Sequence, residues 1–215
     1  MAAAATGSNG KGSKVVLASR NQHKIAEVRR ILADARSDIE LVGLDELAVA
    51  VQEVPETGAT FAENALIKAQ SVVDATGLPA IADDSGIEVD ALNGMPGVLS
   101  ARWAGKHGDD MANLDLVLAQ ISDVPEQRRG ASFVAAVVLV RDGASPIVVE
   151  GKVSGRLLFH SAGEGGFGYD PIFVPAGQDL TTAEMSAEQK DQVSHRGQAL
   201  RALVTRMKED EHRPS

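Results

Sequence analysis

Short apolar runs alternate with helix-length amphipathic segments in the first part of this sequence. The runs at 15–17 and 80–82 each have the length and apolar character of a buried strand. Between them, apolar residues recur at helical spacing over 25–35 and over 61–73, and a glycine and then a proline follow the second series. This switching between strand and helix patterns predicts an α/β fold.

The later part of the sequence predicts strands that are joined differently. Residues 131–140 and 146–153 are strand-like, and the turn-forming segment 141–144 between them predicts a hairpin. Hairpin strands are antiparallel, so we expect a mixed sheet flanked by helices. A half-exposed strand is also predicted at 87–91, and a helix over 109–121.

Two more helices are predicted near the C-terminus. Thr181-x-x-Glu184 has the pattern of a capping box that starts one helix. Apolar residues over 200–207 form the buried stripe of the other.

A chain of 215 residues has room for one sizeable domain with two lobes around a cleft. Residues 1–13 are small, polar or glycine and lack periodicity, so we expect a disordered tail. The expected domain covers 14–209, and 210–215 form a short C-terminal tail.

Composition excludes several classes of protein. The absence of cysteine excludes disulfides, thiolate metal sites and thiol catalysis. There is no apolar run of about 18 residues and no signal-peptide pattern, which predicts a cytoplasmic protein without a membrane partner. A formal net charge of -9 with no basic patch argues against nucleic-acid binding.

Two adjacent acids, Asp83 and Asp84, follow the predicted strand at 80–82. Neighbouring side chains of a strand point to opposite faces, so we expect one carboxylate to do the chemistry. It could hold Mg²⁺ or take a proton from water, with Glu56 as a possible second metal ligand. A simple turn, in which acid and serine bond to local backbone, is the alternative at this stage.

A second candidate stretch lies between the first predicted strand and helix. It consists of Ser19, Arg20, Asn21, Gln22, His23 and Lys24. The N-terminus of a helix attracts anions, and Lys24 could contact a phosphate there. The alternative is that Ser19 or Asn21 only caps the helix and Lys24 is solvated.

A third stretch combines two of the few aromatic rings with an acid. Residues 163–168 match G-x-G-x-x-G, but a turn and a predicted strand follow them, so we expect a flexible loop and not a dinucleotide site. Phe167 and Tyr169 could stack on a base while Asp170 accepts hydrogen bonds from its edge. Both rings could equally be ordinary core side chains.

Cationic or proton-donating side chains form the fourth candidate. Lys190, His195 and Arg196 lie within seven positions of an otherwise acidic chain. They could face a phosphate or a carbonyl group, or could be a solvated helix start.

Four motifs occur in register: S-x-N-x-x-K, A-D-D-S-G, G-G-F-G-Y-D-P and K-x(4)-H-R-G-x-A-L. Together they cover the chain from about 14 to 207, and they closely resemble the inosine triphosphate pyrophosphatase family, also called non-standard purine NTP pyrophosphatases. Members hydrolyse ITP, dITP and XTP to the monophosphate and pyrophosphate. Ser19 stands where the family often has threonine, which keeps the hydroxyl.

The resemblance implies a role for each candidate residue. Asp84 would be the catalytic acid-base residue and would bind Mg²⁺ together with Glu56. The implied substrate-binding residues are Ser19, Arg20, Asn21, Gln22, His23 and Lys24 for the triphosphate with Ser85 nearby, Phe167, Gly168, Tyr169 and Asp170 for the base, and Lys190, His195 and Arg196 to complete the pocket. It also implies a cleft between two lobes and a homodimer.

Three other interpretations differ from this one. A Maf-like pyrophosphatase would act on other nucleotides, and Asn21, Lys24 and the S-H-R-G segment argue against it. A nucleotide sensor without turnover would not need the carboxylates of Asp84 and Glu56. A nucleic-acid binder would need a basic surface.

Overall fold

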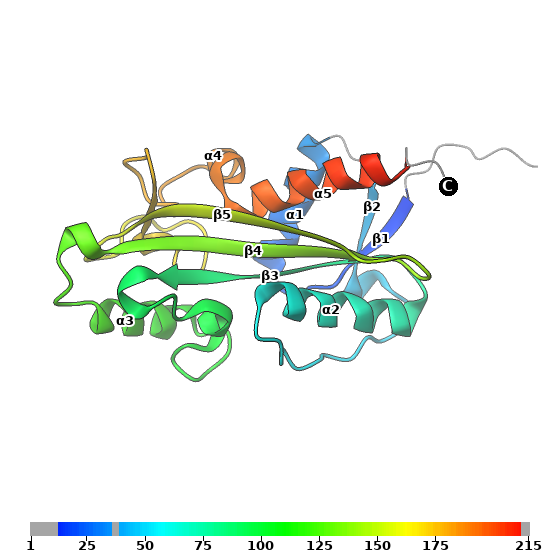
Figure 1. Cartoon of the computed structure of the whole chain (residues 1–215), viewed down its shortest axis with the longest axis horizontal. Helices are drawn as coiled ribbons and strands as arrows, with labels where there is room; N and C mark the ends of the chain where they lie inside the picture. The colour runs from blue at the N-terminus through cyan, green and yellow to red at the C-terminus, as the bar shows by residue number, and fades with distance from the viewer. Residues whose placement is uncertain (1–12, 36–38, 212–215) are drawn as a thin grey trace, which may run out of the picture.

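A six-stranded mixed sheet forms the centre of the protein (Figure 1). Its strands are β1 (Ser13–Leu17), β2 (Ile39–Gly43), β3 (Ala80–Val89), β4 (Gly130–Val140), β5 (Ile147–Leu157) and β6 (Phe173–Pro175). The computed structural model describes residues 13–35 and 39–211, and the strand order is β2-β1-β3-β4-β5-β6. β1 is parallel to β2 and β3, whereas β3 to β6 are antiparallel neighbours. The prediction of a mixed α/β fold is confirmed.

Helices cover both faces of the sheet. They are α1 (Gln22–Asp34), α2 (Phe61–Thr76), α3 (Asp110–Gln120), α4 (Ala187–Val193) and α5 (His195–Glu211). α2 and α3 lie on one side, and α1, α4 and α5 on the other (Figure 1). Consecutive residues of β1 pack on opposite faces of the sheet. Leu17 lies in one core cluster with α1 and α5, and Val16 lies in another with α2.

β3 differs from the prediction. We expected a short strand that ends at the acid pair and a separate one at 87–91, but one strand of 10 residues runs through both regions. The reason is the partner strand: β4 pairs with β3 along its whole length, including Asp83↔Val137 and Asp84↔Ala136. We had interpreted the two adjacent acids as the end of a strand. Asp83 and Asp84 instead lie inside the sheet, where cations from other elements neutralise their charge.

One further expectation needs correction. The Thr181–Glu184 box closes a single turn, and α4 begins later, at a second capping box formed by Ser186 and Gln189. The sequence patterns also gave no indication of β2. α5 runs to Glu211. The rest of the tails expected at 1–13 and 210–215, namely 1–12 and 212–215, lies outside the described residues.

A buried arginine, Arg129, connects several elements at the end of the sheet where β4 begins and β5 ends. Arg129 is 0% exposed, and its guanidinium donates to the carbonyl oxygens of Ile121, Val124, Leu157 and Leu158 at 2.6, 3.4, 3.1 and 2.8 Å. These carbonyls come from the end of α3, the turn after it and the end of β5. The planar fork of arginine, with five donors, suits such a cluster of acceptors.

Arg129→Ala is therefore expected to lower the free energy of unfolding by about 3 kcal/mol or more, because several buried carbonyls lose their donor. Urea unfolding measures the change. The neighbouring Arg128 is exposed, so Arg128→Ala is the matched control and should change stability by less than about 0.5 kcal/mol. Equal losses in the two variants would contradict this role of Arg129.

Candidate active site

A cavity of about 680 Å³ opens beside β3, beyond the end of β1. β1 pairs with β3 only at Val16↔Ala80 and Leu17↔Ile81, so the rest of β3 has no strand on that edge. Side chains from both faces of β3 can therefore reach one cavity, although they point in opposite directions. The predicted site residues that line it are Ser19, Arg20, Asn21, Lys24, Glu56, Asp84, Ser85, Phe167, Gly168, Tyr169, Asp170, Lys190, His195 and Arg196. Of the predicted set, Gln22 and His23 are not in this lining.

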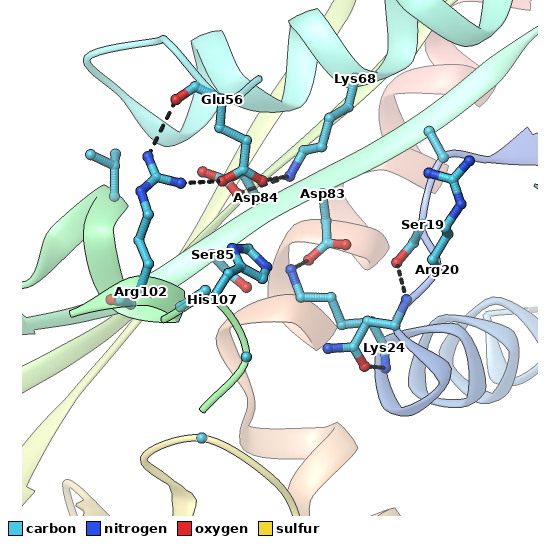
Figure 2. Close-up of a pocket in the computed structure, with 18 of the residues that line it drawn as sticks. Ser19, Arg20, Lys24, Glu56, Lys68, Asp83, Asp84, Ser85, Arg102 and His107 are labelled. Carbon is cyan, nitrogen blue, oxygen red and sulfur yellow. Dashed lines mark hydrogen bonds and ion pairs between the residues drawn. The ribbon is translucent and has the colours of Figure 1, made fainter. Parts of the chain in front are cut away.

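On the α2 face of β3, two carboxylates share one cation (Figure 2). The Lys68 ammonium lies 2.9 Å from Asp84 Oδ1 and 3.1 Å from Glu56 Oε1. Asn64, one helical turn before Lys68 on α2, donates to Asp84 Oδ2 at 3.3 Å. Burial raises the pKa of Asp84 and outweighs the opposing pull of the Lys68 ammonium. Burial and proton-accepting oxygens make this carboxylate a suitable base.

Glu56 lies in the coil before α2 and is held from two sides. Besides the contact with Lys68, Arg102 Nη1 lies 3.1 Å from Glu56 Oε2, and Arg102 Nη2 donates to the Glu56 carbonyl at 3.3 Å. Burial would raise the pKa of Glu56, but the surrounding cations, first among them Lys68, hold it below its usual value. Our site prediction missed Lys68, Arg102 and Asn64, which lie outside the four motifs.

On the opposite face of β3, Asp83 bonds to cations from α1 and α5. Asp83 Oδ2 lies 3.0 Å from Lys24 Nζ and 3.1 Å from Arg196 Nε. These cations, Lys24 first, outweigh burial and hold the pKa of Asp83 far below its usual range. The simpler interpretation, in which Lys24 is solvated, is wrong. Lys24 is ion-paired with Asp83, and burial lowers the pKa of its ammonium. The two neighbouring acids therefore have different environments, and only Asp84 has a raised pKa.

Arg196 is the centre of a buried network. Its side chain is 1% exposed, and Nη1 lies 2.5 Å from Glu27 Oε2 while Nη2 donates to Ser85 Oγ at 2.9 Å. With Nε on Asp83, each of its three nitrogens has a protein acceptor. Arg196 thus links α1, β3 and α5 below the cavity, and Glu27 is a further residue that our site prediction missed.

The stretch before α1 has both capping and anchoring roles. Asn21 is the N-cap, because its Oδ1 accepts from the amides of His23 and Lys24 at 3.0 and 3.2 Å. Ser19 Oγ accepts from the Asn21 amide at 3.2 Å. Arg20 Nη2 donates to Val51 O at 2.5 Å, which anchors the coil that leads to Glu56. The capping interpretation of Asn21 is therefore right, and it places Lys24 in the first turn of the helix, facing Asp83.

The third motif forms another wall of the cavity. Asp170 is buried, and its carboxylate already accepts from Lys190 Nζ at 2.6 Å, Thr182 Oγ1 at 2.8 Å and the Phe167 amide at 2.8 Å. Tyr169 packs in the core, as the alternative interpretation had it, and burial raises the pKa of its hydroxyl. Phe167 is half-buried, with Lys190 Nζ 4.9 Å from the centre of its ring. Among these residues Phe167 is the one whose ring can meet a ligand.

His195 adds a neutral polar group to the cavity. It stacks on Phe133 with 4.8 Å between ring centres, and its ring nitrogens have no hydrogen-bond partner among residues 13–35 and 39–211. Burial, and next the charges of Arg196 and Lys190, hold its pKa well below 6.5. The start of α5 comes this close to β5 because Gly151 has no side chain: a Cβ there would lie 2.0 Å from the His195 carbonyl oxygen.

Relatives of this chain are enzymes of nucleotide hydrolysis. The model of the Ham1 family matches residues 15–206. A dITP/XTP pyrophosphatase of Nocardia farcinica is 58% identical over 193 residues, covering 89% of this chain and 93% of that protein. The dITP/XTP pyrophosphatase of Streptomyces coelicolor is 55% identical over 197 residues, covering 92% and 98%.

Solved structures agree with these matches. The crystal structure of a nucleoside-triphosphatase, dITP/XTP pyrophosphatase, from Mycobacterium abscessus has a TM-score of 0.72 at 57% identity, covering 88% of this chain and 98% of that one. A HAM1 protein from Coxiella burnetii has a TM-score of 0.81 at 40% identity, covering 92% and 99%. In the described part of the chain, no helix is both long and apolar enough to span a membrane.

Proposed function

The chain belongs to the Ham1 family and is a nucleoside triphosphate pyrophosphatase, and we propose that its substrates are the non-standard purine nucleotides ITP, dITP and XTP. It cleaves them with water, in a reaction that requires Mg²⁺, to the nucleoside monophosphate and pyrophosphate. This activity removes such nucleotides from the cellular pool. The Maf-like and sensor interpretations have no match among the relatives described above.

One arrangement carries the proposal: the buried Asp84 carboxylate stands beside Glu56 and Lys68 at the open edge of β3. Asp84 takes the proton of the attacking water, and a raised pKa makes it a stronger base than an ordinary aspartate. Lys24 and Lys68 provide positive charge for the triphosphate on the two faces of the strand. Cleavage of a phosphoanhydride depends mainly on such positioning and charge neutralisation.

The residues fit a Mg²⁺ ion. Glu56 and Asp84 already converge on one cation, the Lys68 ammonium, so their oxygens can bracket a metal in the same region. No group of three or more His, Asp or Glu side chains that could hold a metal occurs in the described part of the chain. Mg²⁺ suits this set, because it is commonly held by one or two carboxylates together with substrate phosphates. When bound, the ion would neutralise phosphate charge, which a protein of net charge -9 needs locally.

Few protein groups are available to recognise the purine base. Phe167 offers a ring face, and neutral His195 offers one N–H donor, which suits the 6-keto oxygen of hypoxanthine or xanthine. A 6-amino group would set donor against donor and leave buried groups unpaired, which can give large selectivity. Arg196 mainly supports the wall of the pocket, because its nitrogens already donate hydrogen bonds to protein groups.

A homodimer and a cytoplasmic location are part of the same proposal and follow from the family resemblance. The ligand partner is a purine nucleoside triphosphate.

The test is pyrophosphate release from ITP, dITP, XTP, GTP and ATP, each with and without Mg²⁺. We expect hydrolysis of the first three to need the metal and to exceed that of ATP, the nucleotide with a 6-amino group, by at least about tenfold in kcat/KM. The slower hydrolysis expected of GTP, which shares the 6-keto group, follows from the family resemblance alone. Hydrolysis of ATP at the rate of ITP would contradict the substrate assignment, and binding of ITP without any release of pyrophosphate would favour the sensor.

His195→Ala provides the control for base reading. It removes the donor that faces the base, so the preference for ITP over ATP should shrink while release from ITP stays metal-dependent. An unchanged preference for ITP over ATP would contradict the assignment of His195 to the 6-keto oxygen.

A further inference from the structure

The loop at 163–168, which brings Phe167 to the cavity, is rich in glycine. It contains no helix or strand, and Gly163, Gly166 and Gly168 have positive φ angles of 86°, 73° and 61°. Backbone of this kind loses much conformational freedom when it is ordered. The Phe167 ring itself stacks on His23 with 5.6 Å between ring centres. The backbone of the loop is held by hydrogen bonds that its amides donate.

Two of the hydrogen bonds that the loop amides donate stay within the C-terminal part of the chain. The Gly165 amide donates to Ala183 O at 3.0 Å, and the Phe167 amide donates to Asp170 Oδ2 at 2.8 Å. They fix the loop to its own neighbours and not to the opposite wall of the cavity.

A third bond joins the loop to a different element. The Gly168 amide donates to Asp110 Oδ2 at 2.8 Å, across 58 positions of sequence. Asp110 is the first residue of α3, is half-buried and lines the cavity. Tyr169, the residue after the loop, donates its hydroxyl hydrogen bond to Ser100 O at 2.9 Å and so makes a second contact with the segment before α3. A hydrogen bond from an amide to a carboxylate is stronger than one to a neutral oxygen, so this contact can hold a glycine-rich segment in place.

Asp110 is not the N-cap of the helix that it begins. The N-cap of α3 is Asp109, whose Oδ1 accepts from the Ala112 amide at 3.4 Å. The two adjacent aspartates thus have separable contacts: one caps the helix and the other reaches the loop.

We propose that Asp110 is a positioning residue, which holds Phe167 at the base-binding side of the cavity by accepting the Gly168 amide. The nature of the ligand rests on the proposed function, whereas the contact itself does not. Without the carboxylate, the glycine-rich loop occupies more conformations, and only a fraction of the molecules present the ring correctly. Apparent affinity falls by that fraction, while the chemical step at Asp84 is unaffected.

Asp110→Ala and Asp110→Asn, with Asp109→Ala as the matched control, test the proposal. Asp110→Ala should raise KM for ITP about tenfold with kcat changed less than about twofold. Asp110→Asn keeps an acceptor oxygen and should recover most of the affinity. Asp109→Ala should lower the melting temperature but leave KM within about twofold of the wild type.

Hydrogen exchange of the ligand-free protein tests the contact without any substrate. Amides at 163–170 should exchange faster in Asp110→Ala than in the wild type or in Asp109→Ala. A raised KM with unchanged exchange would overturn the proposal, because Asp110 would then touch the nucleotide directly. Unchanged KM with faster exchange would overturn it too, since loop position would not control binding. If no nucleotide is hydrolysed by the wild type, the proposed function fails, but the exchange result still decides whether Asp110 holds the loop.

Discussion

Asp84→Asn is expected to lower kcat for ITP by about 10² to 10⁴, the range that general base catalysis contributes. Asparagine has the same shape, so it can still accept a hydrogen bond from Lys68, which lies 2.9 Å from Asp84 Oδ1. It cannot take a proton from water, and it is a poorer metal ligand. Initial rates of pyrophosphate release under saturating ITP and Mg²⁺ measure the loss.

A surface aspartate gives the matched control. Asp74 is exposed on α2 and accepts a hydrogen bond from Gln70 at 2.7 Å, so Asp74→Asn should leave kcat within about twofold. Urea unfolding must show that Asp84→Asn stays within about 1 kcal/mol of the wild type, because its partners keep an acceptor. A folded Asp84→Asn enzyme with wild-type kcat would refute Asp84 as the base.

The fold could be predicted where local pattern and tertiary contact agree. α1, α2, α3 and the β4–β5 hairpin follow from periodicity, caps and turn residues. β3 could not be delimited, because the burial of Asp83 and Asp84 depends on cations from α1, α2 and α5 that no local pattern reveals. Single-sequence patterns report the chain's own periodicity and not the partners that neutralise a buried charge.

The site divides in the same way. Motif residues such as Lys24, Lys190 and His195 were found as candidates, and the structure brings them to one cavity. Lys68 and Glu27 were missed because each lies alone on a helix, where a charged residue is most often solvated. Arg196 was predicted to complete the pocket, and the structure shows that its three nitrogens bond to protein groups. A residue's presence in a site can thus be inferred from sequence more readily than its partner.

Arg196→Ala is expected to lower the free energy of unfolding by about 3–5 kcal/mol, the cost of removing one partner from a buried ion pair. The variant leaves the carboxylates of Glu27 and Asp83, which are 2% and 3% exposed, without their shared guanidinium. Arg30→Ala is the matched control: Arg30 lies 2.8 Å from Asp191, but its side chain is 42% exposed, so the loss should be below about 1 kcal/mol. Similar losses in both variants would contradict the central role of Arg196. For this reason Arg196→Ala is a poor probe of base selectivity, and His195→Ala is the better one.

The pH dependence of that difference tests the electrostatic cause. The folded protein holds the pKa of Asp83 far below its ordinary value of 3.8, so its ion pairs stabilise the fold fully above that pH. As the pH falls below 3.8, the unfolded chain takes up a proton that the folded Asp83 does not, and the stabilisation is lost. In Arg196→Ala the folded pKa of Asp83 lies closer to its unfolded value, so this variant loses less on acidification. The stability gap between wild type and variant should therefore narrow between about pH 5 and pH 3 in equilibrium urea unfolding. A gap that is constant over this range would contradict pairing with Asp83 as the source of the stabilisation by Arg196.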